Sequence, residues 1–224
     1  MANFVRREVA RRVFAKELMN STYSMKDERE KSPVYVLTPL GLKCNRVFVI
    51  GALTEKTEVG EEGGVWRVRI VDQTGTFVGY ISRYQPDAFE AIAEIDTLTL
   101  VAVTAKVRLF EAGTRTLVSL RPESINITDV ESRDYWVVET ARATIKRIRE
   151  MERGETENAR LAREIYGTDL DEYRKAVKEA LLRLKEEYAA EEVESEEIEE
   201  EEEVDEFDFE IEEEDIDLSE LLED

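Results

Sequence analysis

Residues 101–110 alternate between apolar side chains and mostly polar ones, and this pattern constrains the fold more than any other feature of the chain. Successive side chains of a β-strand point to opposite faces of its sheet, so the alternation predicts a strand with one buried face. The side chains on the predicted buried face are Val101, Val103, Ala105, Val107 and Leu109. Those on the predicted solvent face are Thr104, Lys106, Arg108 and Phe110. This part of the chain is therefore expected to lie in a sheet with a partly basic outer face.

Similar patterns occur on both sides of this strand. The five predicted strands cover residues 46–57, 65–72, 76–82, 101–110 and 115–121. A short amphipathic helix separates the third strand from the fourth and begins at Pro86, because proline is favoured at the first position of a helix. Three strands, a helix and two further strands are the order of a five-stranded OB-fold barrel. We therefore predict a mainly β domain at residues 33–130, an OB-fold barrel followed by α-helices.

Three further segments flank the barrel. Residues 1–32 are predicted to form a helix or ordered arm and a linker, residues 131–153 a long helix, and residues 154–190 a short helical pair. One face of the long helix carries an apolar stripe that includes Val137, Ala141, Ile145 and Ile148. We expect this stripe to contact another subunit in an intersubunit helical bundle. The alternative is that the helix folds back onto its own barrel.

Acidic residues are concentrated in residues 191–224. This segment holds 22 of the 53 Asp and Glu side chains and no Lys or Arg, so it accounts for the net charge of −22. Residues 1–190 are neutral overall, and the charge of the whole chain gives no argument against an anionic ligand for the barrel. A segment of such charge density cannot bury enough apolar surface to offset its ordering entropy. We therefore predict a disordered acidic C-terminal tail.

The composition excludes several classes of chemistry. Cys44 is the only cysteine and there is no histidine, so disulfides, Cys/His zinc sites and an imidazole base are excluded. The chain has no phosphate-binding loop and no nucleophile elbow, and Asp72 beside a glycine turn favours a hairpin residue over a magnesium ligand. The longest apolar run, residues 47–53, is too short to span a membrane, and the N-terminus has no signal-peptide core. We expect a cytoplasmic, nucleoid-associated protein that is not an enzyme and needs no cofactor.

Nucleic-acid binding is better supported, because cationic and aromatic side chains share the predicted solvent faces. Single strands are held by cations that neutralise phosphates and by rings that stack on bases. The candidate residues are Arg67, Arg69, Arg83, Tyr84, Lys106, Arg108, Phe110 and Arg115. A cation on a solvent-facing strand can equally be a solubilising residue. Trp66 is expected in the core, and the pattern does not decide which of Phe77 and Tyr80 is inside.

Five ordered motifs carry a resemblance to a known family. They are Thr38–Phe48, Trp66–Phe77, Tyr84–Pro86, Arg121–Ile125 and Arg133–Thr140. Together they resemble the euryarchaeal replication protein A middle-subunit and associated-protein family over roughly residues 33–150. The resemblance implies an OB fold that binds single-stranded DNA and joins other replication protein A subunits in a hetero-oligomer, without enzymatic activity. It also implies that Phe110 stacks on a base, as the equivalent aromatic does in the eukaryotic middle subunit, and that Tyr84 lies near a second stacking position.

The leading hypothesis is thus a single-stranded-DNA-binding subunit that protects single strands in replication, recombination and repair. The alternative is a non-catalytic assembly or recruitment adaptor whose OB fold contacts proteins. A metal-dependent nuclease on the same scaffold is a third and weaker interpretation.

Apolar residues interleaved in the acidic tail suggest a partner-binding role for it. They include Phe207, Phe209, Leu218, Leu221 and Leu222. A primase, a polymerase or a repair protein would be the partner, and the alternative is a tail that only keeps the protein soluble.

Overall fold

The computed structural model describes residues 8–26, 34–60 and 64–190. The chain divides into two compact units, residues 1–181 and residues 182–224. Residues 182–190 of the second unit are helical. The predicted disorder and partner-binding residues of the acidic tail, 191–224, lie outside the described residues.

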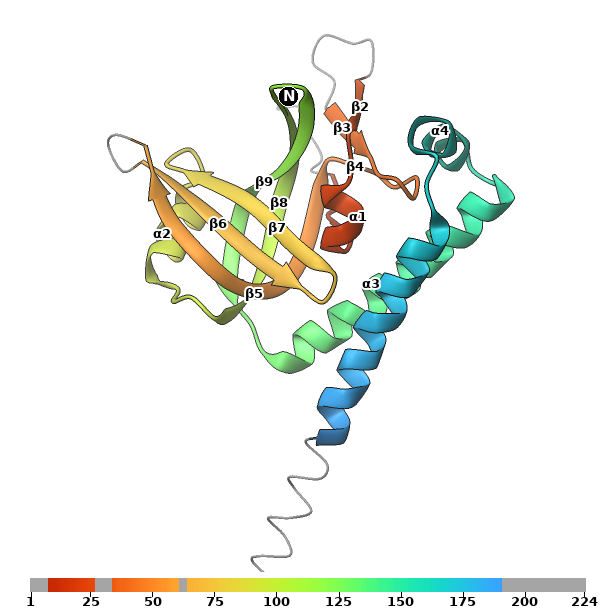
Figure 1. The fold of residues 1–224 in the computed structure, drawn as a ribbon. Helices are drawn as coiled ribbons and strands as arrows, with labels where there is room; N and C mark the ends of the chain where they lie inside the picture. Colours follow the sequence, from red (N-terminus) through yellow and green to blue (C-terminus); the bar gives the residue numbers. More distant parts are fainter. Residues whose placement is uncertain (1–7, 27–33, 61–63, 191–224) are drawn as a thin grey trace, which may run out of the picture. The chain divides into compact units, whose positions relative to one another are not determined.

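A closed five-stranded barrel forms the centre of the first unit (Figure 1). Its strands are β5 (Arg46–Val59), β6 (Val65–Asp72), β7 (Gly75–Ser82), β8 (Thr99–Ala112) and β9 (Arg115–Ile127). They are hydrogen-bonded in the order β5-β6-β7-β9-β8, and β8 pairs with β5 to close the barrel. Helix α2 (Pro86–Glu94) connects β7 to β8. The predicted OB fold is therefore confirmed, with β8 and β9 longer than expected.

The long strand β5 closes the barrel because it pairs with two partners along its length. Residues 46–53 pair with β8, and residues 52–59 pair with β6, with a register shift between Leu53 and Glu55. Such a bulge bends a strand and increases its twist, which lets one strand turn a corner. Gly51 lies at the crossing, where a Cβ atom would meet the Val71 carbonyl oxygen at 2.4 Å. Only glycine fits there without a shift of the backbone.

Alternation along the strands fills the barrel interior as the sequence predicts. Val101, Val103, Ala105 and Val107 of β8 are buried, whereas Leu109 is only half-buried. Phe77 is fully buried and Tyr80 is 37% exposed, which decides the orientation of β7. Trp66 is half-buried, with the Lys56 ammonium 5.9 Å from its ring centroid.

The N-terminal segment is more structured than a helix and linker. It contains β1 (Arg11–Arg12), which extends the barrel sheet beside β5, and the single-turn helix α1 (Ala15–Met19). Three short strands, β2 (Tyr23–Lys26), β3 (Val34–Leu37) and β4 (Lys43–Cys44), form a second sheet. Strand β2 corrects the prediction of an irregular linker at this point, because pairing with β3 overrides its polar sequence.

Two helices follow the barrel, and a third occupies residues 170–181 of the first unit. Helix α3 (Val130–Arg153) begins where the Asp129 carboxylate accepts a hydrogen bond from the Ser132 amide, and it ends at Gly154 with φ 62°. Helix α4 (Glu157–Tyr166) is capped by Thr156. None of the described helices is long and apolar enough to cross a membrane.

The apolar stripe of α3 packs against its own chain. Val137, Ala141 and Ile148 are 0–2% exposed within the single chain, and Ile145 is half-buried. The indole of Trp136 donates to the Phe48 carbonyl on β5 at 3.0 Å, and its ring meets Phe14 edge-on. Within the single chain this stripe is buried, with Ile148 packed against Leu40 and Tyr173, and an intersubunit contact through it stays a prediction.

Candidate nucleic-acid interface

The outer face of β6 and β7 combines cations with an aromatic ring. Arg67 lies directly opposite Tyr80 in the strand register, so the two side chains share the solvent face. Arg67 and Arg69 both form ion pairs with the Glu55 carboxylate, at 3.2 Å and 3.6 Å. One carboxylate between two guanidinium groups leaves a net positive charge. This face can therefore attract phosphate and offer a ring for stacking.

The hairpin of β8 and β9 carries the strongest part of the predicted site. Lys106 and Arg108 are exposed, and neither forms an ion pair with any residue that the structure describes. Phe110 is 41% exposed and lies opposite Leu117, which is 42% exposed. The register of β8 predicted from alternation is thus the one observed. An exposed aromatic ring beside unpaired cations is what base stacking with phosphate neutralisation requires.

Strand pairing connects these two faces around the barrel. Strand β7 runs parallel to β9 with Gly79 beside Leu120, so Tyr80 and Arg121, the next residues on each strand, are neighbours. Arg121 in turn lies opposite Lys106, and Lys106 lies opposite Arg46 of β5. We call this sequence of neighbours the cross-strand row: Arg67, Tyr80, Arg121, Lys106 and Arg46.

Like charges stand next to one another in the cross-strand row. Directly opposed like charges destabilise a sheet unless an anion compensates them. Glu123 supplies one carboxylate, which accepts a hydrogen bond from the Arg46 Nε at 2.5 Å. The Nε of Arg121 is buried and has no hydrogen-bond acceptor among the described residues. The row therefore has more positive charge than its own acids neutralise, and phosphate groups would supply the balance.

The remaining predicted residues lie at the edges of this surface. Arg83 and Tyr84 are exposed in the turn after β7, where the Arg83 side chain passes close to Gly64 at the start of β6. Tyr84 is 92% exposed. Arg115 lies at the tip of the β8–β9 hairpin, opposite Ala112.

Three residues of the surface, Tyr80, Arg46 and Arg121, were not among the predicted site residues. Arg121 ends the predicted fifth strand, and pairing with Lys106 brings it into the row. Tyr80 could not be assigned because β7 has an aromatic residue on each face. Arg46 lies at the beginning of a strand and becomes part of the site only when β8 closes against β5. These contacts become visible only when the strand pairing of the closed barrel is known. The alternation along β7 shows by itself only that Tyr80 and Phe77 lie on different faces of the strand.

Two polar groups that could suggest other chemistry are structural. The Asp72 carboxylate accepts hydrogen bonds from the amides of Ala15, Thr74 and Gly75 and from the Thr74 hydroxyl, which confirms the hairpin interpretation. Burial raises the pKa of Asp72, and these donors oppose the rise. Burial raises the pKa of the Cys44 thiol to about 12, so this thiol is not a nucleophile at neutral pH. No group of three or more potential metal ligands occurs in the described part of the chain.

Comparison with known proteins gives a fold but no family. No model of a known protein family matches the sequence, and no curated protein matches it significantly. Among solved structures, a chain of the S. pombe Stn1-ten1 complex is 12% identical, with a TM-score of 0.52 over 66% of this chain and 100% of that chain. This similarity shows the shared OB fold.

Two other solved structures are similar over smaller or looser alignments. A chain of a replication protein A heterotrimer bound to ssDNA is 13% identical, with a TM-score of 0.45 over 62% of this chain and 98% of that chain. The S. cerevisiae mitochondrial single-stranded DNA binding protein Rim1 is 19% identical, with a TM-score of 0.31 over 38% of this chain and 94% of that chain.

Proposed function

We propose that this protein binds single-stranded DNA without strong sequence preference, as a non-catalytic subunit of an archaeal replication protein A-type complex. The cross-strand row carries the proposal, because it aligns four cations with Tyr80 across five strands of one barrel. The OB fold is a scaffold whose outer strands commonly bind oligonucleotides. The five sequence motifs support the more specific assignment.

Each part of the surface has its own task in this proposal. Lys106, Arg108 and Arg121 would neutralise successive phosphates, while Tyr80 and Phe110 would stack on bases. Stacking tolerates every base because every base has a π-face, so the surface would read charge and shape rather than sequence. A strand held in this way is protected during replication, recombination and repair.

Direct binding measurements test the proposal. Fluorescence anisotropy with labelled oligonucleotides of mixed sequence should give saturable binding that weakens linearly in log affinity against log salt. Duplex DNA of the same length should bind less tightly, because its bases are not available for stacking. Absence of salt-dependent binding to single strands by the intact protein would reject the proposed function.

An adaptor role is the second candidate, and the exposed Phe110 and Leu117 pair favours it. Two apolar side chains opposite each other on a hairpin can also form a protein contact. In that case Phe110→Ala would abolish capture of a partner subunit while the affinity for oligonucleotides stayed unchanged. The same variant in both assays therefore separates the two candidates.

Assembly with another subunit would use the outer face of α3 instead of the inner stripe. Tyr135 is 64% exposed and Val138 is 36% exposed, and the two are three residues apart on the same helix face. An exposed aromatic and aliphatic pair is the type of surface that a second helix covers. We propose this face as the contact with a companion subunit of the complex.

The acidic tail completes the proposal. Its 22 carboxylates would compete with phosphate for the cations of the barrel, and its apolar residues would bind replication or repair proteins. Truncation after Ala190 should strengthen binding to single strands at low salt. Replacement of Phe207, Phe209, Leu218, Leu221 and Leu222 by serine should preserve the competition and remove the protein partner. A tail that only solubilises the protein would change neither measurement.

A further inference from the structure

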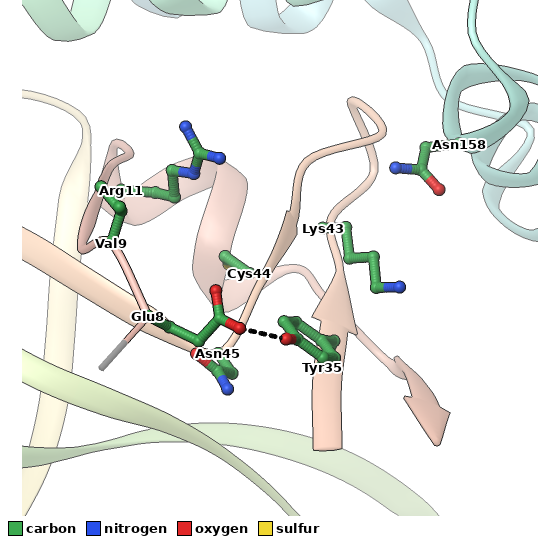
Figure 2. A pocket seen from close by; sticks show the side chains of 8 residues that line it. All are labelled: Glu8, Val9, Arg11, Tyr35, Lys43, Cys44, Asn45 and Asn158. Carbon is green, nitrogen blue, oxygen red and sulfur yellow. Dashed lines mark hydrogen bonds between the residues drawn. The ribbon is translucent and has the colours of Figure 1, made fainter. Parts of the chain in front are cut away.

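Two adjoining hollows lie outside the barrel face, between the N-terminal arm, β4 and the beginning of α4. Their volumes are about 310 Å³ and 330 Å³, and they share Arg11, Lys43 and Asn158 as lining residues. Figure 2 shows Arg11 and Lys43 on opposite sides of Cys44, with Asn158 on α4 beyond Lys43. Three segments that are far apart in the sequence thus contribute polar side chains to the lining of the same hollows.

Most side-chain hydrogen-bond donors that line these hollows have no acceptor among the described residues. The Arg11 guanidinium and the Asn158 side-chain amide form no hydrogen bond or ion pair with the described residues. The Lys43 ammonium lies 4.7 Å from the centre of the Tyr35 ring and has no carboxylate partner among those residues. An anion could therefore bind here without displacing an existing partner.

The acids that line the hollows are fewer than the cations, with Glu8 in the first hollow and Glu150 in the second. The Glu8 carboxylate accepts a hydrogen bond from the Tyr35 hydroxyl at 2.6 Å. In the second hollow, Glu150 lies 3.8 Å from the ammonium of Lys146, at the limit of an ion pair. The Arg147 guanidinium forms an ion pair with the buried Glu17 carboxylate. The excess of cations over acids accordingly comes from Arg11 and Lys43, with Lys146 beside them.

The hollows begin where the cross-strand row ends. Asn45 lines the first hollow, and its carbonyl accepts a hydrogen bond from the Val107 amide of β8 at 2.9 Å. The next residue, Arg46, ends the row and donates from Nη1 to the Glu8 carbonyl at 3.4 Å. Lys106, Arg46 and Arg11 thus lie on the neighbouring strands β8, β5 and β1.

We propose that these hollows bind phosphate groups of the same single strand after it passes the cross-strand row, so that the N-terminal arm and the barrel form one extended site. This inference rests on the proposed function. Continuity with the row favours a phosphodiester chain, and the separate donors suit phosphates spaced along a strand. An acidic peptide with interleaved Phe and Leu would need apolar pockets, whereas the shared lining residues are all polar or charged.

A length series of single-stranded oligonucleotides tests the inference. An OB fold covers about 4–16 nucleotides, so homopolymeric strands from about 6 to about 30 nucleotides include lengths that reach only the barrel and lengths that extend beyond it. The test variant is Arg11→Ala with Lys43→Ala in the full-length protein. The matched control is Arg142→Ala with Lys178→Ala, which removes the same charge from exposed helix positions that line neither hollow.

The expected result is a loss that depends on length. The test variant should bind the shortest strands as the unmodified protein does and should fail to gain affinity as the strand lengthens. Its salt slope on the longest strand should fall by about 1.4, because each phosphate contact on a single strand contributes about 0.7. The control variant should keep both the gain and the slope. Equal binding by the test variant and the unmodified protein at every length would overturn the inference and leave the proposed function intact.

Two further experiments determine which kind of anion binds in the hollows. If inorganic phosphate raises the melting temperature of the unmodified protein but not of the test variant, and strand length has no effect, the site takes free phosphate and the extended path is wrong. If a synthetic peptide of residues 205–224 binds in an Arg11- and Lys43-dependent way while strand binding is unchanged, the site is for an acidic peptide and the inference is again rejected. If no strand of any length binds the unmodified protein, the proposed function itself fails.

Discussion

The Nη2 atom of Arg147 on α3 lies 2.6 Å from the Oε2 atom of Glu17 on α1, and this ion pair connects residues 130 positions apart. Glu17 is 1% exposed, and its other oxygen accepts a hydrogen bond from the Thr38 hydroxyl at 2.8 Å. Arg147 also donates to the Thr144 hydroxyl. A buried pair of this kind holds α3 against its own N-terminal segment.

Removing one member of this pair should destabilise the protein. Arg147→Met leaves the Glu17 carboxylate buried without its partner, and the free energy of unfolding should fall by about 3–5 kcal/mol. Glu17→Gln combined with Arg147→Met should recover part of the loss, because no buried charge remains. Urea denaturation of the single and double variants gives the coupling energy. Arg142→Met, at an exposed position of the same helix, serves as the control, and equal stability of Arg147→Met and the unmodified protein would contradict the interpretation.

Phe110→Ala should weaken binding to single strands without lowering the melting temperature. Loss of one stacked base costs about 1–3 kcal/mol in such sites, which corresponds to an affinity decrease of roughly 5-fold to 150-fold. Anisotropy titration measures the affinity, and circular dichroism measures the melting temperature. Tyr135→Ala removes an exposed ring from α3 and should leave DNA affinity unchanged in the isolated chain. A large fall in melting temperature with unchanged binding would show that Phe110 is a packing residue.

Lys106→Ala and Arg121→Ala should each reduce the salt dependence of binding. A lost phosphate contact should lower the slope of log affinity against log salt by about 0.7 for single strands. Arg121→Ala should in addition leave stability unchanged or raise it, because it removes a buried donor atom that lacks an acceptor within the described residues. Arg142→Ala is the charge-matched control. Unaltered salt slopes in both row variants would exclude the cross-strand row from the binding surface.

Cys44 should remain unreactive in the folded protein and should make stability decrease at high pH. Burial raises the pKa of its thiol from 9.0 to about 12, so the folded state holds the proton more tightly than the unfolded chain. This contribution to stability is fully present below pH 9 and is lost as the pH rises from 9 toward 12. Urea denaturation at pH 7 and pH 10.5 should show a larger decrease for the unmodified protein than for Cys44→Ala. Rapid stoichiometric labelling of the native protein by a thiol reagent at pH 8 would contradict the burial.

Charge substitutions on the two faces of α3 should have different consequences. Ile148→Glu places a charge where the side chain is 2% exposed, so it should unfold the chain or strongly lower its stability. Tyr135→Glu with Val138→Glu changes exposed positions and should leave the fold intact while it weakens capture of a companion subunit. Thermal melts and co-purification distinguish the two. A stable Ile148→Glu protein that fails to assemble would restore the inner stripe as the intersubunit surface.

The sequence alone determined the features that depend on local periodicity. Alternation along residues 101–110 placed Lys106, Arg108 and Phe110 on the solvent face of β8, because the side-chain period of a strand is two. The order of strands and the single intervening helix predicted the OB barrel. Helix α3 was recognised from its apolar stripe, and the structure begins it at Val130, one residue before the predicted start at residue 131.

Tertiary structure decided which surfaces are covered and which cations are neighbours. The apolar stripe of α3 predicts only that this face of the helix is buried. The structure shows that α3 packs against its own chain, because Trp136 contacts Phe14 and Arg147 contacts Glu17, each more than 100 residues away. Strand β7 carries an aromatic residue on each face, and the closed barrel buries Phe77 and exposes Tyr80. Arg46 joins Lys106 and Arg121 only because β8 pairs with both β5 and β9. Such contacts depend on long-range pairing, which no periodicity within a single segment specifies.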